Sequence, residues 1–183
     1  MRFAFLILSL LLAAPAAAQQ PRGFAWKVGD KNAPANSAQA AKDGFGVMML
    51  VTADPEGFWK AWQGATPPQL QTTTRVTRDQ PVQAELIFSG CSAAADGNCN
   101  VTAELSMTGP SGAPYGETAT GKVWSGPPAP GYNLQLSQSG LGFILEPQDP
   151  LGVYVIKAAV TDHVAGRTLH VQQSITAVAP TGK

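Results

Sequence analysis

Charged and metal-binding side chains are scarce in this sequence. The chain has two cysteines and two histidines, and its twelve basic and twelve acidic residues give a net charge of zero. The basic residues form no cluster, whereas binding to phosphate backbones requires clustered Lys and Arg. An anionic membrane surface would require the same positive charge. The sequence therefore predicts no nucleic-acid partner.

The two histidines, His163 and His170, do not complete a metal site. A hairpin could bring them onto neighbouring strands, but a metal ion would need at least a third ligand. Asp162 is adjacent to His163, and successive residues of a strand face opposite ways. We therefore interpret both histidines as solvent-facing and predict no metal site and no cofactor.

The serines and paired carboxylates show no catalytic pattern. Ser89, Ser92 and Ser125 lie outside a Gly-x-Ser-x-Gly context, and no histidine with an orienting carboxylate accompanies them. Glu85 and Glu104 fall on the polar faces of predicted strands, where solvated charges are expected, and glycoside hydrolysis would also need a cleft between such carboxylates. The sequence predicts no catalytic residues, so we expect a protein that is not an enzyme.

The one long apolar run lies at the N-terminus. Arg2 precedes the apolar residues 3–14, and the small residues 15–18 follow in an Ala-x-Ala arrangement. These are the features of a cleavable secretory signal, and the run is too short to span a bilayer comfortably. We predict a signal peptide over residues 1–18, a periplasmic or secreted mature chain, and no stable membrane insertion after cleavage.

The two cysteines, Cys91 and Cys99, flank a stretch rich in turn formers. In an oxidising compartment this spacing favours a disulfide over two unrelated free thiols, with a contribution of about 2 kcal/mol for so short a loop. The spacing is not Cys-x-x-Cys, so a redox centre is not indicated. The strands on either side are expected to form a hairpin with the disulfide at its tip.

The composition of the mature chain changes near residue 44, where a polar stretch gives way to an apolar one. Residues 19–43 contain few apolar anchors and are predicted to form a loosely ordered arm. Asp54 and Pro55 then supply a cap and a first-turn proline for a short helix. Phe58 and Trp62 would share one face of this helix, which we expect to close one end of a sandwich.

The rest of the chain has the two-residue periodicity of strands. Apolar residues alternate with polar ones over residues 82–88, 101–107, 154–160 and 168–172, and no longer helix is indicated. A turn at residues 162–167 predicts a hairpin between the last two of these strands. The pattern predicts an all-β sandwich of about seven to nine strands over residues 44–178, followed by a tail at residues 179–183.

The run Asp149-Pro150-Leu151-Gly152-Val153-Tyr154 resembles the corner before the penultimate strand of immunoglobulin-like domains, where Asp-x-Gly-x-Tyr is common. The resemblance implies an immunoglobulin-like β-sandwich in which the Tyr154 hydroxyl bonds back to upstream backbone. The two cysteines are too close in sequence to join two sheets as in antibody domains. The resemblance is therefore one of architecture.

A wider resemblance covers residues 50 to 171. The chain is similar there to small exported, periplasmic proteins of Gram-negative bacteria that have no assigned role. The residues that carry this resemblance are Asp54-Pro55 with Phe58 and Trp62, Phe88-Ser89-Gly90-Cys91 with Gly97-Asn98-Cys99, Pro127-Pro128 before Asn133-Leu134-Gln135-Leu136, and Asp149 to Tyr154. It implies a periplasmic sandwich and supplies no catalytic residues.

The remaining function class is a non-catalytic binding module. Its partner would be another envelope or extracellular protein, bound through a sheet edge or through the loops that hold Trp59, Tyr115, Trp124 and Tyr132. The alternative is a carbohydrate-binding module in which these aromatic rings stack on sugars.

Overall fold

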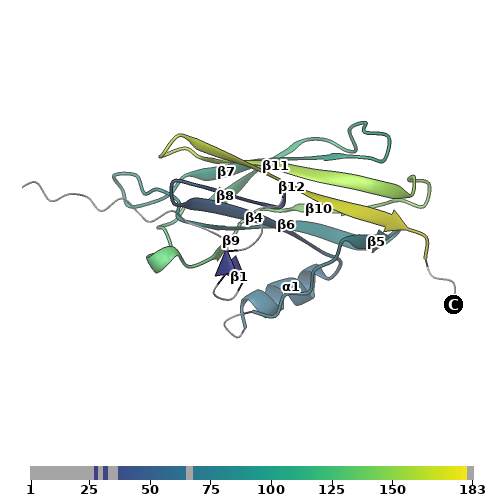
Figure 1. Cartoon of the computed structure of the whole chain (residues 1–183), viewed down its shortest axis with the longest axis horizontal. Helices are drawn as coiled ribbons and strands as arrows, with labels where there is room; N and C mark the ends of the chain where they lie inside the picture. Colours follow the sequence, from purple (N-terminus) through teal and green to yellow (C-terminus); the bar gives the residue numbers. More distant parts are fainter. Residues whose placement is uncertain (1–26, 29–30, 33–36, 65–67, 181–183) are drawn as a thin grey trace, which may run out of the picture.

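Two β-sheets face each other across one hydrophobic core in the computed structural model, which describes residues 27–28, 31–32, 37–64 and 68–180 (Figure 1). The β6 sheet contains β3 (Gln39–Lys42), β4 (Phe45–Thr52), β6 (Pro81–Ser89), β9 (Gln135–Leu136) and β10 (Leu141–Ile144). The β11 sheet contains β5 (Arg75–Thr77), β7 (Val101–Thr108), β8 (Ala119–Trp124), β11 (Gly152–Asp162) and β12 (Arg167–Val178). The strands β1 (Lys27–Val28) and β2 (Lys31–Asn32) pair separately, and the helices are α1 (Pro55–Trp62) and the 3₁₀ turn η1 (Pro130–Tyr132).

The strand order is that of an immunoglobulin-like sandwich, which confirms the predicted fold class. In the β11 sheet the order is β5-β12-β11-β7-β8, and β5 runs parallel to the last strand. In the β6 sheet the order is β10-β6-β4-β3, with β9 also pairing β6. The Tyr154 hydroxyl donates to the Pro150 carbonyl oxygen at 2.9 Å, which is the corner hydrogen bond that the resemblance implies.

The alternating residues of the predicted strands face the core. In β7 the burial pattern alternates without a break, and Val101, Ala103 and Leu105 are buried while Glu104 is exposed. The β11–β12 hairpin forms as predicted, with Asp162 opposite Arg167 at its turn. Two sheets with one apolar face each bury those faces against each other, which removes the largest apolar area from water.

The predicted hairpin between the strands that flank the cysteines is wrong. β6 pairs with β4, β9 and β10, whereas β7 pairs with β11 and β8, so the two strands belong to different sheets. The predicted disulfide between Cys91 and Cys99 is confirmed, with a Cα–Cα distance of 6.0 Å and both residues buried. The disulfide therefore closes the connection by which the chain crosses from one layer to the other.

Helix α1 lies on the outer face of the β6 sheet and does not close an end of the sandwich (Figure 1). Its N-terminus is capped as predicted, because the Asp54 carboxylate accepts the Gly57 N–H at 2.9 Å. Phe58 packs against Ile87 of β6 and Leu136 of β9 in a second, smaller core. Ile87 interrupts the alternation of β6 because both faces of this strand are covered.

The first strand of the sandwich begins earlier than the sequence predicts. Gln39–Lys42, assigned above to the arm, pair antiparallel with the start of β4. Only four residues long and partly exposed, this strand shows no apolar alternation by which it could be recognised. The predicted signal at residues 1–18 lies outside the described residues, and no helix in the described part of the chain could cross a membrane.

Candidate functional site

Among the aromatic residues predicted to bind a partner, the three whose side chains the structure describes, Trp59, Tyr115 and Trp124, lie far apart. Trp124 lies opposite Val101 at the start of β7, whereas the Tyr115 N–H donates to Met107 O near the end of that strand. Six residues of extended strand separate these positions by about 20 Å. Trp59 lies on α1 over the other sheet, and only the backbone of Tyr132, in η1, is described.

Tyr115 is held in the structure by its contacts. Its ring packs edge-on against Tyr154 with 5.2 Å between ring centroids, and its hydroxyl donates to the Asp149 carboxylate. Burial and the hydrogen bond to Asp149 both raise the pKa of Tyr115. Asp149 also accepts the Glu146 N–H at 2.7 Å, so Tyr115 ties the loop after β7 to the tyrosine corner.

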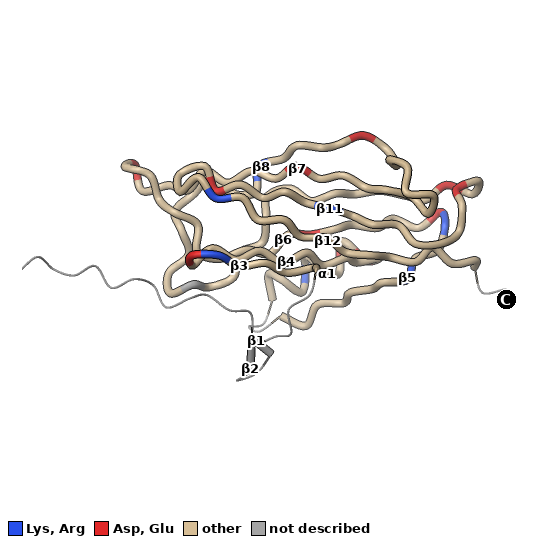
Figure 2. Tube along the Cα trace, turned by 45° about the horizontal axis from the view of Figure 1, so that its top comes forward, with Lys and Arg blue, Asp and Glu red and all other residues tan. Residues whose placement is uncertain are grey.

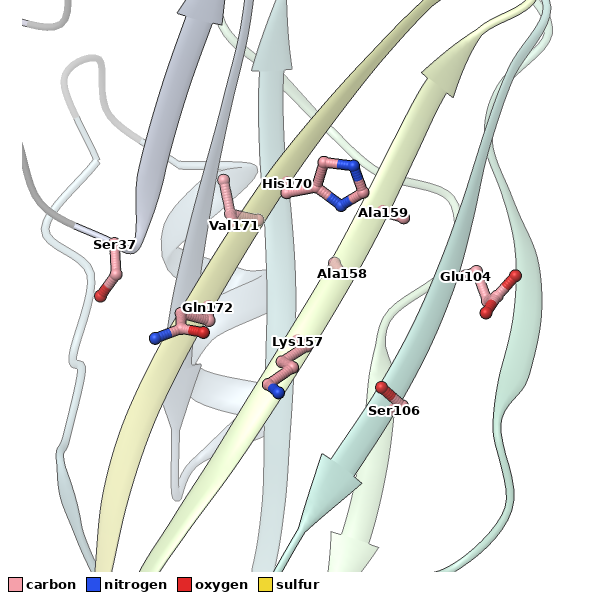
Figure 3. A pocket seen from close by; sticks show the side chains of 9 residues that line it. All are labelled: Ser37, Glu104, Ser106, Lys157, Ala158, Ala159, His170, Val171 and Gln172. Atoms are coloured by element: carbon pink, nitrogen blue, oxygen red, sulfur yellow. The ribbon is translucent and has the colours of Figure 1, made fainter. Parts of the chain in front are cut away.

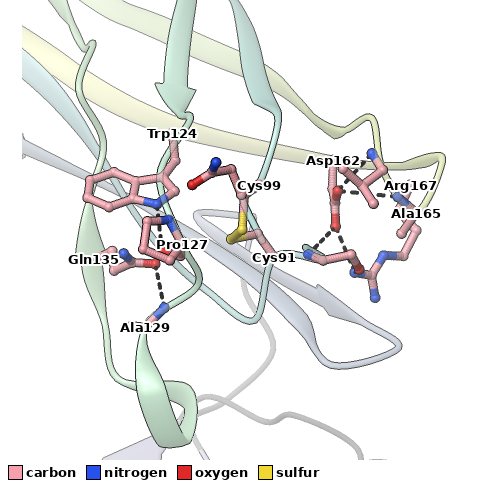
Figure 4. The surroundings of a disulfide bond; sticks show 12 residues. Cys91, Cys99, Trp124, Pro127, Ala129, Gln135, Asp162, Ala165 and Arg167 are labelled. Atoms are coloured by element: carbon pink, nitrogen blue, oxygen red, sulfur yellow. Dashed lines mark hydrogen bonds and ion pairs between the residues drawn. A yellow bond between two sulfur atoms is a disulfide. The ribbon is translucent and has the colours of Figure 1, made fainter. Parts of the chain in front are cut away.

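Trp124 is likewise a packing residue (Figure 4). Its ring lies 6.0 Å from that of Phe88, and its indole N–H donates to Pro127 O at 3.0 Å. The same connection is fixed at Ala129, whose N–H donates to the Gln135 side chain at 3.3 Å. Tyr115 and Trp124 are both only partly exposed, and these contacts hold each ring in place.

Trp59 is the described exception, because 38% of its surface is exposed. Its indole N–H donates to Oε1 of Glu85 at 3.1 Å. Glu85 was expected to be solvated on a polar strand face, but it is 0% exposed. The prediction failed because α1 covers this face, and the signal that could have revealed the cover was Ile87, an apolar residue on the same face two positions later.

A buried ion pair lies beside the disulfide (Figure 4). Asp162 accepts from Arg167 at 2.8 Å and from the Ser92 N–H at 3.0 Å, and Arg167 also donates to the Ser92 hydroxyl at 2.8 Å. The guanidinium lies 5.5 Å above the ring of Phe45. Burial alone would raise the pKa of Asp162, but the Arg167 guanidinium and backbone N–H groups outweigh it and hold that pKa below its ordinary value.

The disulfide itself is expected to stabilise this end of the sandwich. Changing Cys91 and Cys99 together to alanine should lower the free energy of unfolding by about 2 kcal/mol, because the open chain regains the entropy of an eight-residue separation. Urea denaturation of the two proteins without reductant measures the difference. Adding reductant to the alanine variant provides the control, and equal stability of the oxidised wild type and the variant would contradict the prediction.

The outer face of the β11 sheet carries a shallow hollow of about 470 Å³ (Figure 3). Ala159 lies between His170 and Glu104 in the strand pairing, and Lys157 lies between Gln172 and Ser106. Among the described residues that line the hollow there is no Phe, Tyr or Trp. It combines one acidic and one basic side chain with small polar groups, so it lacks the stacking platform that the carbohydrate alternative requires.

The histidines occupy separate environments in the structure. His163 Nε2 lies 2.8 Å from the Thr102 hydroxyl, whereas His170 lines the hollow described above. Among the described residues, no group of three or more His, Cys, Asp or Glu side chains is placed to hold a metal ion. Lys and Arg residues are scattered singly along the described part of the trace (Figure 2).

The edge strands of the two sheets differ in charge. β3, β5 and β8 each carry a basic residue, namely Lys42, Arg75 and Lys122, respectively. β10 has the sequence Leu-Gly-Phe-Ile and no charge, pairs with β6 on one side, and ends the strand order of its sheet. Ile144 on this strand is 53% exposed. Because a charged side chain is a common protection of an edge strand, β10 is the least protected of these four edges.

Comparisons with known proteins add little to these observations. No protein-family model matches the sequence, and no curated protein matches it. Among solved structures, an immunoglobulin-like protein of Pseudomonas aeruginosa is 16% identical over 72% of this chain and 91% of its own, with a TM-score of 0.33. A CARDB domain from Pyrococcus furiosus, crystallised in complex with di-metal ions, is 12% identical over 58% and 81%, with a TM-score of 0.36.

A family 123 glycoside hydrolase from Clostridium perfringens is also similar in part. It is 8% identical, with a TM-score of 0.38, and the match covers 73% of this chain but 27% of the enzyme. All three TM-scores are below 0.5, so the likenesses carry no argument about function. The fold assignment rests on the strand order described above.

Proposed function

We propose that this protein is a non-catalytic module, exported to the periplasm or secreted, that binds an extended segment of another envelope or extracellular protein along β10. The disulfide supports export, because such bonds persist in oxidising compartments. The resemblance to small periplasmic proteins of Gram-negative bacteria supports the same location.

The observation that carries the proposal is the uncharged edge of the β6 sheet. An edge strand presents a row of backbone N–H and C=O groups, and an added peptide strand satisfies them. β10 pairs with β6 over Leu141–Ile144, and no other named strand among the described residues pairs with it. Its outward residues are Gly142, which has no side chain, and Ile144, which is exposed.

The chemistry of β10 indicates the kind of segment that would bind. Backbone hydrogen bonds would supply affinity, while Ile144 would contact an apolar side chain opposite it on the added strand. Gly142 is exposed and has no side chain that could obstruct an incoming one. The expected ligand is therefore an extended, largely apolar segment with little charge.

A change of Ile144 to lysine tests the proposal. Lysine on an edge strand opposes strand addition, so recovery of the partner from an envelope fraction by the immobilised protein should fall at least about tenfold. Val153→Lys is the matched control, because Val153 has a similar exposure of 50% but lies in the other sheet, on β11, opposite Thr176 of β12.

The outcomes separate the proposal from its alternatives. A partner that wild type and Val153→Lys retain and Ile144→Lys loses supports binding at β10. Equal recovery by all three proteins, or recovery of no specific protein, overturns it. Association of the purified protein with itself that Ile144→Lys abolishes would assign the edge to a second copy and would also overturn it.

A further inference from the structure

Glu85 is a carboxyl group enclosed between α1 and the β6 sheet. It lies opposite Leu50 of β4 and is 0% exposed. Its Oε1 accepts the Trp59 indole N–H at 3.1 Å, whereas Oε2 is buried and has no hydrogen-bond partner among the described residues. One neutral donor from α1 is therefore the whole hydrogen-bond environment of this carboxyl group in the described structure.

The backbone before β10 closes the other side of the group. A Cβ atom at Gly140 would lie 2.9 Å from Glu85 Oε2 and 2.6 Å from the Ala84 carbonyl oxygen, so the chain can approach this closely only with glycine there. Gln83 also borders this space, since its Nε2 would lie 3.2 Å from the same Cβ atom. The carboxyl group is thus bordered by the Gly140 backbone and the Gln83 side chain, and Oε2 accepts a hydrogen bond from neither of them in the described structure.

No opposite charge compensates Glu85. β4 and residues 137–142 contain no charged side chain, and Glu85 is the one charged residue of β6. The charged residues of α1 and its cap, namely Asp54, Glu56 and Lys60, are exposed, and none of them forms an ion pair with Glu85 in the described structure. An ionised carboxylate at this position would lose its hydration and gain one neutral hydrogen bond.

We propose that docking of α1 onto the β6 sheet depends on a proton at Glu85. With the proton present, Trp59 closes over a neutral group and Phe58 packs against Ile87 and Leu136. When the proton is lost, the charged carboxylate needs hydration. Water gains access to it when α1 lifts away from the sheet. The lifted state exposes the apolar residues of the second core, so an alkaline shift uncovers a surface that is closed in acid.

The direction of the pH dependence follows from linkage. Burial raises the pKa of Glu85 from 4.5 to about 7, although the Trp59 hydrogen bond lowers it in part. A group with a raised pKa favours the docked state fully below pH 4.5, and this contribution is lost as the pH rises to about 7. The docking equilibrium should therefore fall by up to about tenfold per pH unit as the pH rises over that interval, and be level above it.

Amide hydrogen exchange measured by NMR tests the proposal on the intact protein. The reporters are the Trp59 indole N–H and the helical amides of Phe58 and Gln63, which donate to Asp54 O and Trp59 O. After correction for the intrinsic pH dependence of exchange, their protection in the wild type should fall between pH 5 and 7.5. In Glu85→Gln, which keeps the shape without the ionisation, protection should not change over this range.

The controls make a negative result informative. Glu104→Gln removes an exposed carboxylate from the other sheet and should behave as the wild type. Direct titration of the Glu85 side-chain carboxyl carbon in the wild type remains available if Glu85→Gln does not fold. Equal pH dependence in the wild type and Glu85→Gln, or a carboxyl group that titrates below pH 5, overturns the proposal. Neither result bears on strand addition at β10, which does not depend on this carboxyl group.

Discussion

Replacement of Asp162 with alanine is expected to lower the free energy of unfolding by about 3–5 kcal/mol at pH 7, because it leaves the Arg167 guanidinium largely buried without its carboxylate. The same change removes the acceptor of the Ser92 N–H. Urea denaturation measures the effect. Glu117→Ala removes an exposed carboxylate without a comparable contact and should change the stability by less than about 0.5 kcal/mol.

The pH dependence of this effect distinguishes the ion pair from a packing defect. The pKa of Asp162 lies below its ordinary value, so its stabilising contribution is present above that value and is lost as the pH falls through the pKa of the folded protein. The stability difference between the wild type and Asp162→Asn should therefore shrink below about pH 4. A difference that stays constant down to pH 2 would contradict the ion-pair explanation.

Replacement of Gly140 with alanine is expected to lower the free energy of unfolding by about 1–3 kcal/mol. The new methyl group would lie 2.6 Å from the Ala84 carbonyl oxygen, which belongs to a central strand and cannot easily move. Gly142→Ala is the matched control, since the nearest atom to its Cβ lies 3.9 Å away. Urea denaturation of both variants compares their free energies of unfolding. Equal losses of stability would show that the close contact between residue 140 and the Ala84 carbonyl oxygen does not constrain the fold.

Much of the sandwich was predictable because strand alternation reports which face of a strand is buried. β7 and β11 follow this rule closely, and the turn at residues 162–167 identifies β12 as a neighbour of β11. The position of the helix along the sequence was also predictable, because its cap at Asp54 and the spacing of Phe58 and Trp62 are local signals. Local spacing also sufficed for the disulfide, whose two cysteines are eight positions apart.

Strand partners were not predictable, because alternation does not encode which strand lies alongside. β6 and β7 both have an apolar face and adjoin the same loop, but they belong to different sheets. Short strands such as β9 and β5 have two or three residues and no measurable period. Their position is decided by neighbours that are distant in the sequence.

The candidate sites depended even more on tertiary structure. Nothing in the composition indicates whether a tryptophan packs or is free, and Trp124 packs because a proline-rich connection accepts its N–H. The burial of Glu85 was also not predictable from the sequence, since glutamate is rarely fully buried. The apolar face of α1 and the side chain of Ile87 both need an apolar surface to pack against. Packing one against the other would have predicted that the helix covers Glu85.

The order of strands in the β11 sheet has a consequence for biosynthesis. β7 pairs along its length with β11, so that Val101 lies opposite Asp162, and β5 pairs with the far end of β12. β5 has no neighbour in this sheet until β12 is translated, and β7, which can pair early with β8, gains its second neighbour only with β11. Assembly of the complete layer is therefore expected to follow translation of β12, and contacts between residues so far apart in sequence favour slow folding.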